Sequence, residues 1–141
     1  MAATPYNTDE LAALLDEERD DYCAMHAAGL EQRACLDRDD MAGVSAALAR
    51  ANTLMGRIRL RRARLPGDLA TRSEQQLVLR TNAIRDAIVR VEELRRANQR
   101  TVERLLVETR GDLHRASRGN KVARGYRETR VDEARFFDGR Q

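Results

Sequence analysis

The chain has 141 residues, of which 35% are charged and 4% aromatic, and its formal net charge is +3. This length fits one domain, and the composition favours helices with narrow apolar stripes. No apolar run approaches the roughly 20 residues that a membrane-spanning helix needs, and residues 1–10 lack the basic and apolar regions of a secretory signal. We therefore expect a cytoplasmic protein that does not insert into a membrane.

The charges are distributed unevenly along the chain. Residues 1–40 hold 11 acids and 3 bases, whereas residues 41–141 hold 12 acids and 23 bases. An acidic first helix packed against basic later helices would match these charges internally. The excess of basic residues would also suit a nucleic acid, but the arginines are interleaved with acids, which argues against that partner.

The first predicted helix covers residues 8–37. Asn7 or Thr8 can cap its N-terminus, and Asp9 and Glu10 in the first turn suit the helix dipole. The run Asp-Arg-Asp-Asp at 37–40 breaks the apolar pattern and predicts a tight turn. The apolar stripe of this helix consists of Leu11, Leu14, Leu15, Tyr22, Met25, Leu30 and Leu36.

Both cysteines lie on this predicted helix. At 1.5 Å per residue, Cys23 and Cys35 would be about 18 Å apart, too far for a disulfide bond. Cys23 and His26 have the spacing of metal ligands, but no second pair completes a zinc site. We expect two small thiols that are buried or half-buried, and neither a metal nor a cofactor.

The second predicted helix covers residues 40–64. Five arginines between 57 and 64 crowd its end, where cations are favoured. The sequence Leu65-Pro66-Gly67-Asp68 is the clearest stop signal in the chain. The residues that keep nearly heptad spacing are Met41, Val44, Leu48, Ala51, Met55, Ile58 and Leu65.

The third predicted helix covers residues 72–117 and carries the longest apolar seam. At about 1.5 Å per residue, it would be roughly 67 Å long. Because it outruns the second helix, part of its seam would stay uncovered and become a binding surface. The seam, at steps of three, four or seven, consists of Leu77, Ile84, Ile88, Val91, Leu94, Asn98, Val102, Leu105, Thr109 and Leu113.

These elements predict an all-α fold, an elongated antiparallel three-helix bundle over residues 1–117 with a long third helix. Residues 118–141 hold three glycines and show weak periodicity, which predicts a flexible or conditionally ordered tail. Tyr126, Phe136 and Phe137 are three of the five aromatic residues and lie in this tail. They are candidates for docking, either onto the seam of the chain itself or onto a partner.

The sequence offers little material for catalysis. His26 and His114 are isolated on different predicted helices, serines are few, and no glycine-rich phosphate loop occurs. Adjacent acids such as Glu92 and Glu93 would face different directions on a helix. We therefore expect that the protein is not an enzyme. Asn98, a polar residue on the seam, would either fix the register of the helices or contact a bound partner.

Several features of the layout occur together over residues 8–117. They are the Leu14-Leu15 pair, the acidic turn at Asp39-Asp40, a heptad second helix, and a long third helix with Asn98-Gln99-Arg100 followed by Leu105-Leu106. In this layout the chain resembles the FlgN family of flagellar type III export chaperones. The tail around Gly125-Tyr126 and from Phe136 to Gly139 is similar to the loosely ordered ends of such chaperones.

The resemblance implies a small, non-catalytic cytosolic chaperone. It would bind the terminal helical segments of hook-associated proteins, keep them unpolymerised and deliver them to the flagellar export gate. In such families the C-terminal part of the third helix takes the client, and a tail aromatic, here Tyr126, serves the export gate. The client-binding residues would then be Val102, Leu105, Leu106, Thr109 and Leu113, with Asn98 as the polar member of the same seam.

Two other functions fit the same sequence. The arginines at 57–64 and in the tail suit a basic helical nucleic-acid-binding protein, although the aromatic stacking surfaces and motifs of such modules are missing. Alternatively, the third helix would pair with a second copy of itself in a homodimer or a structural coiled-coil adaptor.

Overall fold

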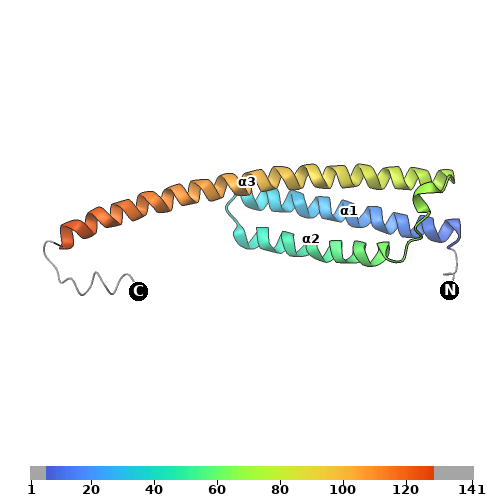
Figure 1. Cartoon of the computed structure of the whole chain (residues 1–141), viewed down its shortest axis with the longest axis horizontal. Helices are drawn as coiled ribbons and strands as arrows, with labels where there is room; N and C mark the ends of the chain where they lie inside the picture. Colours follow the sequence, from blue (N-terminus) through green and yellow to red (C-terminus); the bar gives the residue numbers. More distant parts are fainter. Residues whose placement is uncertain (1–5, 129–141) are drawn as a thin grey trace. The chain divides into compact units, whose positions relative to one another are not determined.

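Three α-helices account for most of the chain (Figure 1): α1 spans Thr8–Asp37, α2 spans Met41–Arg62 and α3 spans Gln75–Glu128. The computed structural model describes the backbone of residues 6–128 and the side chains of residues 6–119 other than Ala70. Within this range there is no β-strand, so the all-α prediction is confirmed. Contacts divide the chain into two compact units, residues 1–101 and residues 102–141, and α3 contributes to both.

A capping box starts α1. The Asn7 side chain accepts a hydrogen bond from the Glu10 backbone N–H at 2.8 Å, and the Glu10 carboxylate accepts one from the Asn7 N–H at 3.1 Å. After α1 ends at Asp37, Asp39 turns the chain with a φ of 56°, a left-handed conformation that aspartate tolerates better than most residues. The predicted bounds of the first helix and the predicted turn are confirmed.

The Asp40 side chain caps α2 by accepting a hydrogen bond from the Gly43 N–H at 2.9 Å. The predicted second helix is confirmed, although it begins one residue later and ends two residues earlier than the predicted range of 40–64. A short 3₁₀-helix, η1 (Leu69–Thr71), follows the Pro66-Gly67 turn.

The two glycines within α2 should respond in opposite directions to alanine. A Cβ at Gly43 would overlap the Sγ atom of buried Cys35 and lie 2.5 Å from the Asp40 carboxylate that caps the helix, whereas a Cβ at Gly56 meets nothing within 4 Å. We expect Gly43→Ala to lower the free energy of unfolding by about 1–3 kcal/mol through overpacking. Gly56→Ala should raise it by about 0.5–1 kcal/mol, because glycine costs that much in a helix interior. Urea unfolding followed by circular dichroism measures both, and equal effects at the two sites would contradict this packing.

The bounds of the third helix differ from the prediction at both ends. It begins at Gln75 rather than residue 72, because η1 and the Arg72–Glu74 ion pair, with a shortest N–O distance of 2.7 Å, occupy the preceding residues. The predicted end at residue 117 is wrong, because α3 continues to Glu128. A glycine costs a helix only about 1 kcal/mol relative to alanine, and no proline follows Pro66, so Gly119 does not end the helix. The predicted division into 1–117 and 118–141 stays a prediction, and residues 129–141 lie outside the described range.

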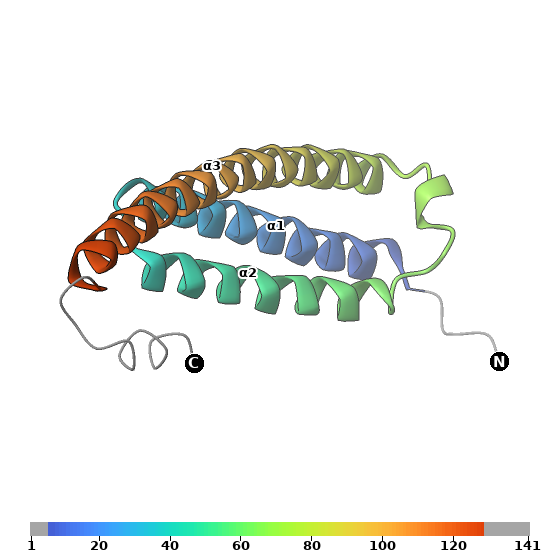
Figure 2. The ribbon, with the colours of Figure 1, turned by 60° about the vertical axis from the view of Figure 1, so that its left-hand side comes forward.

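The first unit holds a core to which all three helices contribute. Figures 1 and 2 both show α1 between α2 and the beginning of α3. Leu11 and Ile58 are fully buried in this core, and Leu77 of α3 is 2% exposed. The buried cluster consists of Leu11, Ala12, Leu15 and Tyr22 of α1, Ile58 of α2, and Leu77, Ile84 and Ala87 of α3.

Ion pairs join α1 to α2, as the charge asymmetry of the sequence suggested. Arg61 Nη2 donates to Asp21 Oδ2 at 2.5 Å, and both side chains are buried. Arg61 Nε also lies 3.4 Å from Glu17, and Arg62 donates to the Tyr22 hydroxyl at 2.5 Å. Burial alone would lower the pKa of Arg61, but its hydrogen bond to Asp21 and the charges of Asp21 and Glu17 outweigh burial and raise that pKa.

Polar contacts also join α1 to α3 within the first unit. Arg80 Nε donates to Asp16 Oδ1 at 3.0 Å, and Arg33 Nη1 donates to Thr101 Oγ1 at 2.6 Å. Between them, a Cβ at Gly29 would lie 2.8 Å from Leu94 Cδ2. The absence of a side chain at Gly29 therefore allows Leu94 of α3 to lie directly against the backbone of α1.

Candidate helix-binding surface

The client-binding residues expected in the second unit share one stripe of α3. The α3 stripe, as we name it, consists of Val102, Leu105, Leu106, Thr109 and Leu113. With 3.6 residues per turn, these five positions fall within an arc of about 100°. Val107 lies on a different side of the helix and offers a comparison within the same segment.

None of the described side chains of the second unit, at positions 102–119, is buried. Leu106 is 50% exposed and Leu113 is 65% exposed, Thr109 is also exposed, and Val102 and Leu105 are half-buried. In the first unit, by contrast, the seam of α3 is buried at Leu77 and Ile84. The seam that the sequence predicts is thus core in one unit and accessible in the other.

The charges around the α3 stripe are mixed and largely paired within the helix. Residues 102–119 contain three acids and four arginines. Arg104 lies 3.8 Å from Glu108, and Arg115 pairs with Asp112. Such exposed pairs contribute little to stability, but they leave little unbalanced positive charge. The surface therefore suits an apolar helix face better than a phosphate backbone, whose binding requires many uncompensated bases.

Asn98 lies in the first unit and is 2% exposed. Its Nδ2 donates to the Gly29 carbonyl at 2.9 Å and approaches Gln32 Oε1 at 3.4 Å. Its Oδ1 atom is buried without a hydrogen-bond partner. These contacts fit the register role of a polar seam residue, because the amide bonds to one place on α1. A direct contact between Asn98 and a client stays a prediction.

The side chains of the three tail aromatics, Tyr126, Phe136 and Phe137, lie outside those that the structure describes. Tyr126 lies within α3, but its side chain is not among those described, and Phe136 and Phe137 lie outside the described residues. Docking through these three residues stays a prediction.

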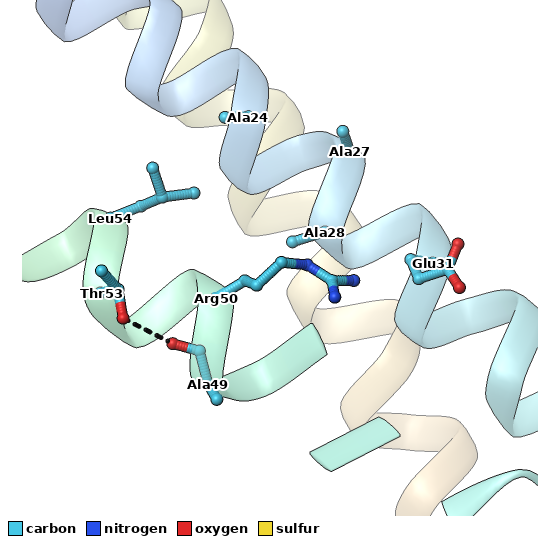
Figure 3. A pocket seen from close by; sticks show the side chains of 8 residues that line it. All are labelled: Ala24, Ala27, Ala28, Glu31, Ala49, Arg50, Thr53 and Leu54. Carbon is cyan, nitrogen blue, oxygen red and sulfur yellow. Dashed lines mark hydrogen bonds between the residues drawn. The ribbon is translucent and has the colours of Figure 1, made fainter. Parts of the chain in front are cut away.

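A cleft of about 620 Å³ lies between α1 and α2. Figure 3 shows its alanine-rich walls, with Arg50 reaching from α2 toward α1. The Thr53 hydroxyl donates to the Ala49 carbonyl at 3.1 Å and is therefore engaged within α2. This cleft was not predicted from the sequence, although the helical spacing of Ala24, Ala27 and Ala28 indicates a helix face of small side chains. The lining residues are Ala24, Ala27, Ala28, Glu31, Ala49, Arg50, Thr53 and Leu54.

The cysteines and the charged residues form no metal site in the part of the chain that the structure describes. There, no three His, Cys, Asp or Glu side chains gather closely enough to hold an ion. Cys35 is buried, as expected, but Cys23 is exposed, so the expectation of a buried or half-buried thiol is wrong for Cys23. Over the same described range, no helix has the length and apolar character needed to cross a bilayer.

Comparisons of the chain with models of protein families, with curated proteins and with solved structures find no match.

Proposed function

We propose that the chain is a non-catalytic cytoplasmic export chaperone for flagellar proteins. In this proposal, the α3 stripe binds the terminal helical segments of hook-associated proteins, and the chain delivers them to the export gate. The observation that carries the proposal is the accessible apolar stripe, in which Leu106 and Leu113 are at least half exposed at helical spacing. The resemblance to the FlgN family supplies the identity of the client.

The stripe suits a helical client for a physical reason. An amphipathic helix that lays its apolar face along such a surface removes leucine and valine side chains from water, which is the helix-in-groove mode of recognition. A client end that is disordered before binding loses conformational entropy when it orders. That loss keeps the affinity moderate, which a chaperone needs in order to release its client.

We infer an antiparallel, up-down-up arrangement for the three helices of the first unit. Two pairs of contacts support an antiparallel α1 and α2: Glu17 lies near Arg61, and Cys35 lies near the position of a Cβ at Gly43. Between α1 and α3, residue numbers rise together, from Asp16 with Arg80 to Arg33 with Thr101. Short connections between consecutive helices favour this topology.

The function is tested by mixing the purified full chain with synthetic terminal helical segments of hook-associated proteins. Fluorescence anisotropy would measure affinity, and light scattering would measure the mass of the complex. We expect saturable binding and a complex with one copy of the chain. A stable homodimer that binds no segment would favour the coiled-coil adaptor instead. Tight binding of DNA or RNA with a steep dependence on salt would favour the nucleic-acid-binding protein.

A further inference from the structure

A second apolar groove lies in the first unit, with α1 as its floor and α2 and α3 as its walls. The α2–α3 groove, as we name it, has a volume of about 310 Å³. It is distinct from the α3 stripe, because every residue that lines it belongs to positions 25–98. The residues that line it include Gly29 of α1, Ala47, Leu48 and Ala51 of α2, and Leu94 and Asn98 of α3.

The α2 wall of the groove combines a small side chain with an exposed apolar one. Ala51 carries only a methyl group and is half-buried, so an approaching helix can come close to the backbone of α2 there. Leu48 stands on the α2 wall and is 45% exposed, and Leu94 is half-buried on the α3 wall. The knobs of a further helix would therefore find space between the two walls and apolar side chains on both.

The charges of the groove have one sign. No acidic residue lines the groove, whereas two arginines line it, Arg59 of α2 and Arg95 of α3. Arg95 already pairs with Glu92 at 2.9 Å on the surface of α3. For Arg59, by contrast, no ion pair is found among the described residues, and α2 carries five arginines and no acid. An occupant with carboxylates beside its apolar face would compensate this charge.

An unsatisfied polar atom belongs to the same groove. Asn98 lines it, and the Oδ1 atom of this buried side chain lacks a donor within the described chain. A buried acceptor without a donor is costly. A hydroxyl or amide donor on a helix seated in the groove would supply the hydrogen bond that this oxygen lacks.

We propose that the α2–α3 groove binds an amphipathic helix of a partner protein whose apolar face is flanked by acidic residues. The apolar walls select a helix with leucine-like knobs, and the arginine on the α2 rim selects its acidic flanks. The partner helix would be the fourth helix packed in the first unit. Its site is separate from the α3 stripe, where the client is proposed to bind.

The test measures binding of a fluorescent peptide to the full chain. The peptide has 21 residues in three heptads, with leucine at positions a and d and glutamate at positions e and g. Anisotropy would measure its affinity beside that of the same peptide with lysine at e and g. We expect the glutamate peptide to bind at least tenfold more tightly than the lysine peptide at low salt. We expect Leu48→Glu to weaken its binding at least tenfold, with no change for Leu60→Glu, a more exposed leucine of α2 outside the groove.

A second experiment reverses the charge of one arginine of the groove. Arg59→Glu should weaken binding of the glutamate peptide and strengthen binding of the lysine peptide, whereas Arg90→Glu, on α3 outside the groove, should do neither. Equal affinity of wild type and Leu48→Glu for the glutamate peptide would overturn the proposal. So would loss of this binding in Leu106→Glu, which would place the peptide on the α3 stripe. A homodimer that Leu48→Glu dissociates would also overturn it, with a second copy as the occupant.

Discussion

Replacing Leu106 by glutamate is expected to weaken binding of a hook-associated helical segment about 30-fold, with the melting temperature of the chain almost unchanged. Leu106 is half exposed in the free chain and lies about midway along the length of the α3 stripe. Its burial against a client would contribute about 2 kcal/mol, and each 1.4 kcal/mol corresponds to about a tenfold change in affinity. Because Leu106 is already in contact with water, a carboxylate at that position should not destabilise the free chain.

Val107→Glu is the matched control for this experiment. Val107 is 67% exposed and directly follows Leu106, but it lies off the stripe. Anisotropy and thermal unfolding on both variants would separate recognition from folding. If Val107→Glu and Leu106→Glu lose affinity equally, the segment is bound by another face of α3. If Leu106→Glu unfolds the chain, Leu106 is core and the stripe is no binding surface.

Most of the fold could be predicted from local sequence signals. Asn7 with Glu10 and Asp40 with the N–H of Gly43 are caps that act over three residues, so a single sequence is enough to place them. The bounds of α1 and α2 follow from such signals. The end of α3 does not, because Gly119 and Gly125 are weak breakers and no proline or capping sequence stood out near residue 117.

Burial along α3 depends on partners that the spacing of the seam does not reveal. Ile84 and Leu113 occupy equivalent positions of one apolar pattern, yet Ile84 is buried and Leu113 is exposed. The pattern predicted that both would face the same way, but Ile84 is covered because it joins a core cluster with residues of α1 and α2. The different lengths of the helices predicted that the seam would be uncovered near its end, and the exposed side chains there are Leu106 and Leu113.

The α2–α3 groove escaped sequence analysis for a related reason. Gly29, Ala47 and Leu94 are far apart in the chain, and their small or apolar side chains give no signal until three helices bring them together. Asn98 was predicted from the sequence to have a structural or binding role, because it is a polar residue on an apolar seam. The structure adds that its amide bonds to the Gly29 carbonyl while its Oδ1 is left without a donor.

The largest effect on stability is expected from Asp21→Ala. Asp21 and Arg61 are both buried, and the substitution would leave the Arg61 guanidinium buried beside Glu17 alone, a mostly exposed side chain. Arg61 Nη1 already lacks a hydrogen-bond partner. Removing one member of a buried pair costs about 3–5 kcal/mol. For a unit of this size, the melting temperature should fall by at least about 12 °C.

The double variant Asp21→Leu with Arg61→Met should recover most of this loss, because replacing both charges by apolar side chains of similar size is often neutral or stabilising. Arg19→Ala is the matched control, since its ion pair with Asp20 is exposed on the same helix, and it should change the free energy of unfolding by less than about 0.5 kcal/mol. Urea unfolding followed by circular dichroism would measure all three variants. An effect of Asp21→Ala as small as that of Arg19→Ala would mean that water reaches the Asp21–Arg61 pair and that the pair does not hold α1 against α2.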